Sequence, residues 1–283
     1  MAKNGHIMSR LDGKIVLITG AARGIGAATA EAMVAAGAKV MIADIDAAEA
    51  GNRAAELGEN AASTTLDVRD PAAWAAAVAE TGRIFGGLTT LVNNAGFGGG
   101  HIETLETLDY DTIRQIVDVN FIGAVLGHQA VVPMMRESGA PCSIVNVSSN
   151  TGVLTMNGYS VYAATKAALI SLTKTAAMEL GPNIRVNAVL PGSVHTDMSN
   201  LMNMDYDTFS SALGGMPLKR AAKAAEIAEP IIFFASDAAK HCTGAELLID
   251  AGQSTGIYFQ MLPGHPDTPF HKLTKAGPEK MKG

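Results

Sequence analysis

Ile15-Val16-Leu17-Ile18-Thr19-Gly20-Ala21-Ala22-Arg23-Gly24-Ile25-Gly26 is the stretch that decides the fold of this chain. The run Ile15–Ile18 is continuously apolar, which is typical of a strand buried on both faces of a parallel sheet. The glycines that follow allow a tight turn, and an alanine-rich helical pattern then continues to Ala36. A strand, a glycine turn and a helix in this order predict a phosphate-binding junction, because the helix N-terminus offers N–H groups to a pyrophosphate.

Apolar runs and helical patterns alternate along the rest of the chain. This alternation predicts a single α/β domain on a doubly wound parallel sheet of about seven strands, with helices on both faces. We expect an N-terminal extension at 1–10, the domain at 11–255 and a C-terminal tail at 256–283. Further strands are predicted at 40–43, 63–66, 88–92, 143–147, 184–190 and 246–249, and helices at 46–57, from 71, from 109 into the 130s, at 162–180 and at 225–236.

Composition narrows the classes of function. The net charge of −6 gives no reason to expect a nucleic-acid partner. The two cysteines, Cys142 and Cys242, lie far apart, which argues against a disulfide framework and against a metal site. The N-terminus lacks the apolar core of a secretory signal, and no apolar run without a charge is long enough for a membrane span. We therefore expect a cytoplasmic protein with no metal and no membrane partner.

An acidic residue at the end of the second strand bears on the cofactor. Asp44 follows the glycine turn by about 20 residues, the separation at which a carboxylate binds the ribose hydroxyls of NAD. It would repel a 2′-phosphate, and its neighbours Ala43 and Ile45 offer no cation to hold one. Arg23 leaves the alternative open, since it could pair with such a phosphate. The sequence favours NAD over NADP, with helix capping as the alternative role for Asp44.

A tyrosine and a lysine stand four residues apart in a helical pattern. Tyr162 and Lys166 then share one helix face. An ammonium beside a phenol favours the phenolate, so we expect Lys166 to lower the pKa of Tyr162 and make it a useful proton carrier. Ser149 lies upstream, just after the predicted strand 143–147. Taken alone, the pair could equally be two residues on a solvated helix.

Together with other motifs, these residues resemble the short-chain dehydrogenase/reductase family over roughly 11–252. The resemblance implies a single Rossmann-type domain, nicotinamide-dependent oxidoreduction of alcohols and carbonyls, and a dimer or tetramer, here a homotetramer. In chain order, the motifs that carry it are the turn Thr19–Gly26, Asn93-Asn94-Ala95-Gly96, Asn120, Ser149, Tyr162 with Lys166, and Pro191-Gly192.

The resemblance implies a role for each catalytic residue. Tyr162 would be the general acid/base, and Lys166 would lower its pKa and bind the nicotinamide ribose. Ser149 would donate a hydrogen bond to the substrate oxygen as charge develops there. Asn120 would hold a water in a proton relay from Lys166. Ser148 is the rival of Ser149, but the offset to Tyr162 matches the second serine of the family pattern.

A cofactor site along the strand ends is implied in the same way. Asp67 and Val68 would contact the adenine, Ala95 and Gly96 the adenosine ribose, and Val194 the carboxamide, with Thr196 on the carboxamide or phosphates. The full set is Gly20, Arg23, Gly24, Ile25, Gly26, Asp44, Asp67, Val68, Asn94, Ala95, Gly96, Tyr162, Lys166, Pro191, Gly192, Val194 and Thr196.

The segment 193–223 is expected to cover the substrate. Methionine and aromatic side chains make an adaptable apolar surface, which favours an uncharged alicyclic or steroid-like alcohol or ketone. The alternative is that half of them only anchor the lid to the core. The residues are Met198, Met202, Met204, Tyr206, Phe209 and Met216.

Two loops, 98–101 and 151–156, are expected to form the other walls. His101 could meet a polar substrate group or lie in solvent. No cluster of Arg and Lys converges here to bind a carboxylate, CoA or a carrier protein.

Three functions remain in competition. The leading one is an NAD-dependent dehydrogenase or carbonyl reductase acting on a small-molecule secondary alcohol or ketone. An NADPH-dependent carbonyl or 3-oxoacyl thioester reductase is the second, and Asp44 argues against it. A non-catalytic NAD-binding or scaffold protein is the third, since fold does not fix function. The helices near 109–135 and 160–180 are apolar on more than one face, so we expect them to pair in a homo-oligomer.

Overall fold

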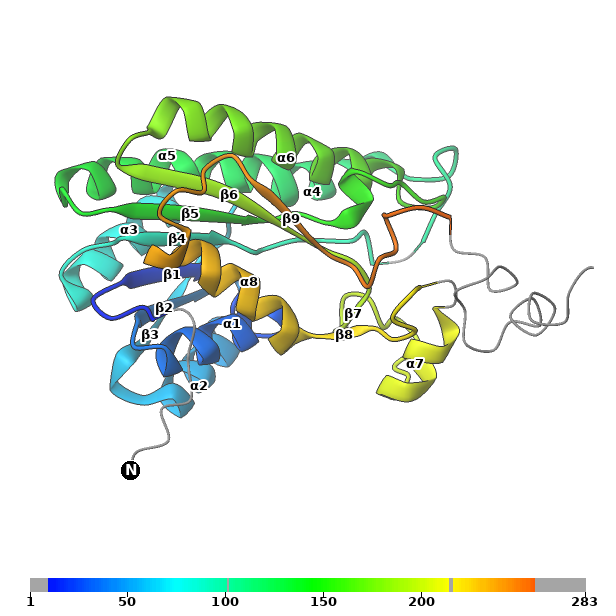
Figure 1. Cartoon of the computed structure of the whole chain (residues 1–283), viewed down its shortest axis with the longest axis horizontal. Helices are drawn as coiled ribbons and strands as arrows, with labels where there is room; N and C mark the ends of the chain where they lie inside the picture. Colours follow the sequence, from blue (N-terminus) through cyan, green and yellow to red (C-terminus); the bar gives the residue numbers. More distant parts are fainter. Residues whose placement is uncertain (1–9, 101, 214–215, 258–283) are drawn as a thin grey trace, which may run out of the picture.

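The computed structural model describes residues 10–100, 102–213 and 216–257. Its centre is a seven-stranded sheet in the order β3-β2-β1-β4-β5-β6-β9, with every neighbouring pair parallel (Figure 1). The order reverses between β1 and β4, so the predicted doubly wound sheet is confirmed. The strands are β1 Ile15–Thr19, β2 Lys39–Asp44, β3 Ala61–Thr65, β4 Thr90–Asn93, β5 Cys142–Val147, β6 Ile184–Pro191 and β9 Glu246–Ile249.

Helices cover both faces of the sheet, as expected. Helices α1, α2 and α8 pack on one face, and α3, α4, α5 and α6 on the other (Figure 1). Short 3₁₀ turns add to them, of which Asn150–Gly152 matters for the site. The helices are α1 Gly24–Ala35, α2 Ala47–Leu57, α3 Pro71–Phe85, α4 Tyr110–Val117, α5 Gly123–Glu137, α6 Ser160–Leu180 and α8 Ala224–Ala235.

The first strand shows why its sequence is apolar without alternation. Val16 and Ile18 belong to the cluster packed under α1 and α8, whereas Leu17 belongs to the cluster under α3 and α5. All three side chains are fully buried. A strand that supplies both cores at once needs an apolar side chain at every position.

The long helix after β4 is not regular. A π-helical turn, Asp118–Ile122, joins α4 to α5, where the sequence predicts uninterrupted helix. By length and composition alone, the stretch Tyr110–Glu137 could cross a membrane, but a core helix passes the same test. Here it packs on the sheet: a Cβ at Gly127 would lie 2.7 Å from Trp74 and from Asn93.

The remaining differences lie at edges and in the lid. Strand β3 begins two residues early because Ala61 pairs with Val40 of β2. The lid region contains a small two-stranded sheet, β7 Val194–His195 with β8 Ala222–Lys223, and the helix α7 Tyr206–Ala212. Residues 1–9 of the N-terminal extension and residues 258–283 of the tail lie outside the described residues.

Candidate active site

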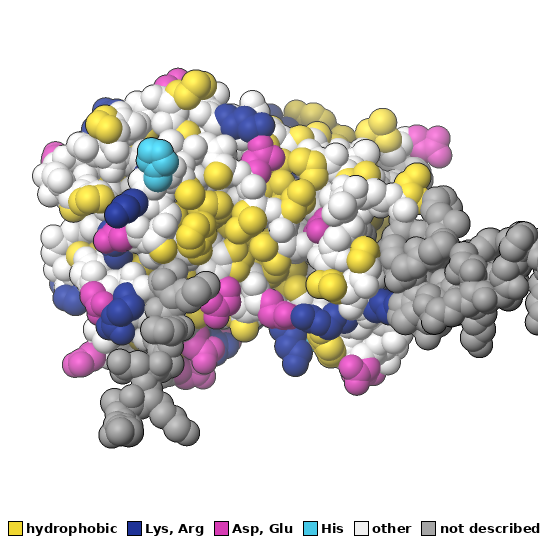
Figure 2. Space-filling view, in the orientation of Figure 1, with side chains coloured by type: hydrophobic (Ala, Val, Ile, Leu, Met, Phe, Trp, Pro, Cys, Tyr) yellow, Lys and Arg dark blue, Asp and Glu magenta, His cyan; other side chains and the backbone are white. Residues whose placement is uncertain are grey.

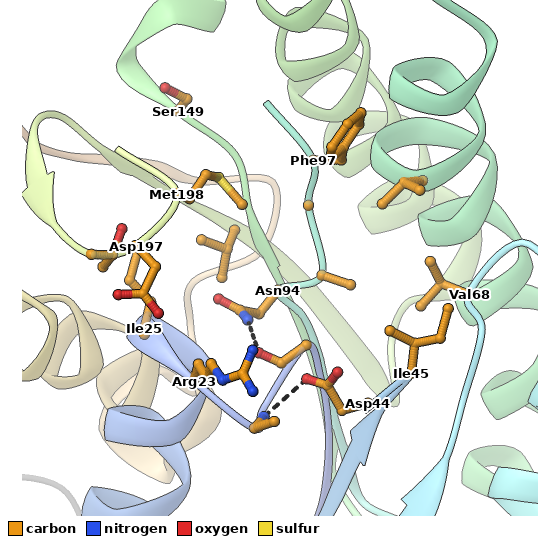
Figure 3. A pocket seen from close by; sticks show the side chains of 18 of the residues that line it. Arg23, Ile25, Asp44, Ile45, Val68, Asn94, Phe97, Ser149, Asp197 and Met198 are labelled. Atoms are coloured by element: carbon orange, nitrogen blue, oxygen red, sulfur yellow. Dashed lines mark hydrogen bonds between the residues drawn. The ribbon is translucent and has the colours of Figure 1, made fainter. Parts of the chain in front are cut away.

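A cleft opens at the carboxyl ends of the strands, where the strand order reverses. Ligands of doubly wound sheets bind at such a point. Its volume of about 510 Å³ is that of a small-molecule site. It is lined by every predicted cofactor residue except Gly26, and by Ser149, Tyr162 and Lys166 of the predicted catalytic set. Ser149 lies at one end of the view and Asp44 at the other (Figure 3).

Hydrogen bonds hold the glycine turn to Asn94, the residue that follows strand β4. The side-chain amide of Asn94 donates to the carbonyl oxygens of Thr19 at 2.9 Å and Gly20 at 3.0 Å. A Cβ at Gly26 would lie 2.3 Å from the carbonyl oxygen of Gly20. Gly26 therefore serves the tight packing of the turn and does not line the cleft, which corrects its predicted place in the cofactor-contacting set.

Asp44 presents its carboxylate to the cleft with backbone support. Its oxygens accept hydrogen bonds from the amides of Ala22 and Asp46, each at 3.0 Å (Figure 3 draws the first). Capping of α2 falls to Asp46, which accepts from the amide of Glu49 at 3.1 Å. The capping alternative for Asp44 is therefore not what the structure shows.

Arg23 is engaged by the same loop. Its guanidinium donates to the second carboxylate oxygen of Asp46 at 2.8 Å; the Arg23 side chain is largely exposed and that of Asp46 is partly exposed. Arg23, the cation that left NADP binding as an alternative in the sequence analysis, is thus paired with an acidic residue two positions after Asp44. Elsewhere along the cleft, Arg69 forms a similar pair with Asp67 and holds the pKa of that carboxyl below its ordinary value through their hydrogen bonds.

The two neighbouring serines point to different places. The Ser148 hydroxyl donates to the backbone carbonyl of Lys166 at 2.8 Å, so it is turned onto α6. The Ser149 side chain lies close enough to the Tyr162 phenol to act on its pKa. Ser149 is thus the serine that meets the tyrosine, as the sequence interpretation expects.

Tyr162 and Lys166 meet as predicted, but with different electrostatics. The Lys166 Nζ lies 5.5 Å from the centre of the Tyr162 ring and donates to the carbonyl of Val147 at 3.0 Å. Burial raises the pKa of Tyr162 to about 12, although the nearby Ser149 side chain opposes the rise. The pKa of Tyr162 is therefore high and not low as the sequence predicts, because burial is the largest influence on the phenol. Part of the Tyr162 surface stays accessible, yet the surrounding protein excludes most of the water that would solvate a phenolate.

Asn120 sits beside this pair without lining the cleft. It lies on the π-helical turn, and its side chain accepts from the amide of Phe97 at 2.7 Å and donates to the Phe97 carbonyl at 3.0 Å. A Cβ at Gly96 would lie 3.5 Å from both Asn120 Oδ1 and Lys166 Nζ. The Asn120 side chain therefore holds the loop that follows β4 in place, close to Lys166.

The lid residues divide as the alternative interpretation allowed. Phe209 and Met216 are buried and anchor the segment. Met198 lines the cleft on the Ser149 side, together with Phe97 (Figure 3), whereas Met202 is 78% exposed. His101 lies outside the described residues.

Several lining residues were not predicted from the sequence. Ile45 and Asp46 directly follow Asp44, so their position at a strand end was an available signal. Gln115 and Val119 reach the cleft from α4 and the π-helical turn, and no local pattern marks them. The other additions are Ala22, Leu66, Arg69, Phe97, Val147, Ser148, Asp197 and Ser199.

Comparison with known proteins gives this geometry a family. The profile described as Enoyl-(Acyl carrier protein) reductase matches residues 20–254. The chain belongs to the short-chain dehydrogenase/reductase family. A 3-alpha-(or 20-beta)-hydroxysteroid dehydrogenase of Mycobacterium tuberculosis is 44% identical, covering 88% of this chain and 92% of its own. A trans-4-hydroxycyclohexanecarboxylate dehydrogenase of Sinomonas cyclohexanicum is 41% identical, covering 89% and 96%.

A solved relative carries a cofactor. The 3-ketoacyl-(acyl-carrier-protein) reductase of Brucella melitensis, complexed with NADH, has a TM-score of 0.80 and 34% identity, covering 86% of this chain and 99% of its own. As a short-chain dehydrogenase/reductase, the chain is an oxidoreductase of the alcohol dehydrogenase type that uses a nicotinamide cofactor. The fastened glycine turn and the carboxylate of Asp44 fit such a group, one at its phosphates and the other at a ribose.

Proposed function

We propose that this protein is an NAD-dependent dehydrogenase that interconverts a secondary alcohol and a ketone on an alicyclic or steroid-like ring. The observation that carries the proposal is that Ser149, Tyr162 and Lys166 line one cleft, with the Lys166 ammonium 5.5 Å from the centre of the Tyr162 ring. The nicotinamide, when bound, takes the hydride from the alcohol carbon or returns it to the carbonyl carbon.

The residues of the chain handle the proton and the developing charge. Tyr162 takes the hydroxyl proton in oxidation and gives it back in reduction. Ser149 donates a hydrogen bond to the same oxygen as it becomes a carbonyl. Lys166 grips the nicotinamide ribose and supplies positive charge near the phenol. Asn120 fixes the adjoining loop through Phe97, and a water held there would pass protons to solvent.

Three observations support the substrate class and the choice of NAD. Met198 and Phe97 give the Ser149 side of the cleft an apolar surface. The relatives named as hydroxysteroid and hydroxycyclohexanecarboxylate dehydrogenases act on ring alcohols. Asp44 would repel a 2′-phosphate, and Arg23, a cation that lines the same cleft, is paired with Asp46.

A 3-oxoacyl thioester reductase is the second candidate, favoured by the likeness to the 3-ketoacyl reductase. It would need cations for the phosphates of CoA or a carrier. The cations that line the cleft are Arg23, Arg69 and Lys166, and the first two are paired with Asp46 and Asp67. This arrangement favours the ring alcohol.

The test follows the absorbance of reduced nicotinamide with a panel of substrates. The panel holds hydroxysteroids, substituted cyclohexanols and a 3-oxoacyl thioester, each with NAD and NADP forms. We expect turnover of ring alcohols with NAD. Tyr162→Phe should lower kcat by about 10²- to 10⁴-fold while binding NAD normally. Turnover confined to the thioester with NADPH would support the second candidate, and wild-type turnover by Tyr162→Phe would remove the role proposed for the phenol.

We also propose that the protein works as a cytoplasmic homotetramer. Exposed apolar side chains support assembly: Tyr110 at the start of α4 is 70% exposed and Met178 on α6 is 78% exposed. Figure 2 shows a further gathering of hydrophobic side chains over β9 and α8, where Leu248 is 45% exposed on an edge strand. Sedimentation of the full chain at micromolar concentration tests this, and a monomer would contradict it.

A further inference from the structure

The Ser149 hydroxyl oxygen accepts two hydrogen bonds, and both donors belong to Thr151. The backbone amide of Thr151 donates to Ser149 Oγ at 3.2 Å, and the Thr151 hydroxyl donates to the same atom at 2.9 Å. A hydroxyl oxygen has two acceptor positions and one proton. Both acceptor positions of Ser149 are therefore taken by one residue.

The proton of Ser149 is only weakly engaged. It points to Asn150 Oδ1 at 3.5 Å, the long limit for a hydrogen bond. The Asn150 amide is in turn held by Gln253 at 3.1 Å. With its acceptor positions filled, Ser149 can meet an incoming oxygen only by giving its proton.

Thr151 lies behind Ser149 as seen from the cleft. It is buried and does not line the cleft. Its 3₁₀ turn, Asn150–Gly152, is pressed onto α6: a Cβ at Gly152 would lie 2.9 Å from the Lys166 carbonyl carbon and 3.0 Å from the Ala167 nitrogen. This packing fixes the position of Thr151 and Ser149 relative to α6, the helix that carries Tyr162.

We propose that Thr151 is a positioning residue that fixes Ser149 as a hydrogen-bond donor toward the substrate oxygen. The inference rests on the role proposed for Ser149 and adds the residue that sets its direction. A serine with a free acceptor position could instead accept a hydrogen bond from the substrate alcohol, and so turn the alcohol proton away from Tyr162. Thr151 closes that option, so the alcohol proton goes to the Tyr162 phenolate, and Ser149 stabilises the negative charge on the substrate oxygen.

The experiment compares kcat and KM for oxidation of a ring alcohol in the full-length protein with NAD. Thr151→Val removes the hydroxyl and keeps the shape. We expect kcat to fall about 3- to 10-fold, the value of one neutral hydrogen bond, with KM and NAD affinity unchanged. Thr151→Ser restores the donor and should return kcat to within about twofold. Thr151→Ala gives a second hydroxyl-free variant if the valine does not fold.

Two controls separate positioning from packing. Thr81→Val removes a buried hydroxyl that donates to the Ala77 carbonyl in α3, away from the cleft, and should leave kcat unchanged. In a Ser149→Ala background, Thr151→Val should change kcat by less than about twofold, since Thr151 then has nothing to position.

The outcomes separate a failure of the role proposed for Thr151 from a failure of the role proposed for Ser149. An unchanged kcat in Thr151→Val and Thr151→Ala, or an equal loss with and without Ser149, would overturn the inference alone. Failure of Thr151→Ser to restore kcat would also overturn it. If Ser149→Ala keeps the wild-type kcat, the role proposed for Ser149 fails, and the inference falls with it.

Discussion

The Lys166 ammonium lies 5.5 Å from the centre of the Tyr162 ring, one helical turn along α6. Burial raises the pKa of Tyr162 to about 12 and lowers the pKa of Lys166 to about 8. Both shifts favour the neutral forms, because the closed site solvates a phenolate and an ammonium poorly. Helical spacing therefore brings the pair together, and exclusion of water sets its protonation.

The pH dependence of turnover follows from these protonation states. Oxidation needs the Tyr162 phenolate, whose fraction grows as pH rises toward the pKa, whereas reduction needs the phenol. We expect kcat/KM for alcohol oxidation to rise across about pH 6 to 10, and kcat/KM for ketone reduction not to rise with it. Initial rates in both directions measure this. Oxidation that slows as pH rises would contradict the assignment of Tyr162 as the base.

Lys166 should set where the oxidation limb lies. Its ammonium favours the phenolate, so Lys166→Met is expected to move the rising limb to higher pH. Lys174→Met is the matched control on the same helix, because Lys174 is paired with Glu246 at 2.6 Å and is largely exposed. If both variants keep the wild-type profile, Lys166 does not act on the phenol.

The same two residues show what sequence can and cannot give. Spacing along a helix is a local property, so the contact of Tyr162 with Lys166 was predictable. Burial depends on Ser149 and the surrounding cleft, which are remote in sequence, so the direction of the Tyr162 pKa was not. The choice of Ser149 over Ser148 came from a family offset, and its physical counterpart, the bond from Ser148 to Lys166, appears only in the fold.

The fold itself shows a similar division. Strands buried on both faces, such as Ile15–Thr19, can be recognised in the sequence because they are continuous apolar runs. The π-helical turn Asp118–Ile122 does not, because its sequence has an ordinary helical pattern and Asn120 meets Phe97 only in three dimensions. The two-residue strands Val194–His195 and Ala222–Lys223 are too short to leave any pattern. Local signals thus predict the sheet, and remote contacts decide the details of the cleft.

Cofactor choice can be tested through the acidic loop after β2. Asp44→Ala removes the carboxylate that opposes a 2′-phosphate, so the preference for NAD over NADP, measured as the ratio of kcat/KM values, should fall by at least about tenfold. Adding Asp46→Asn releases Arg23 and should raise kcat/KM for NADP further, since arginine binds phosphate well. Asparagine is chosen because it still caps α2.

Matched variants complete this test. Arg23→Ala in the double variant should cancel the added gain for NADP. Glu56→Gln breaks an exposed ion pair with Arg53 on α2 and should leave the preference unchanged. A ratio that does not respond to Asp44→Ala would mean that this carboxylate does not discriminate between the cofactors.

Asn94 offers a test of the phosphate-binding turn. Asn94→Ala leaves the carbonyls of Thr19 and Gly20 without their side-chain donor, each bond being worth about 1 kcal/mol. We expect KM for the cofactor to rise several-fold and the melting temperature to fall. Asn52→Ala, an exposed change on α2, is the control. An unchanged cofactor KM would show that the turn holds its shape without Asn94.

His128 predicts how stability depends on pH. It is buried in α5, its Nδ1 bonds to the Ala124 carbonyl at 2.8 Å, and its Nε2 has no hydrogen-bond partner in the described part of the chain. Burial lowers the pKa of His128 below its ordinary value of 6.5. Below pH 6.5 the unfolded chain takes up a proton at His128 more readily than the folded protein does. The free energy of unfolding should therefore decrease as pH is lowered, by up to about 1.4 kcal/mol per pH unit.

Replacing His128 isolates its share of this dependence. His128→Leu should flatten the change in unfolding free energy between about pH 7 and pH 5, whatever its effect on stability at neutral pH. His241→Leu, at an exposed position, should keep the wild-type slope. Chemical denaturation at several pH values gives these slopes. A slope in His128→Leu equal to that of the wild type would place the acid sensitivity elsewhere, because a group that no longer titrates cannot contribute to it.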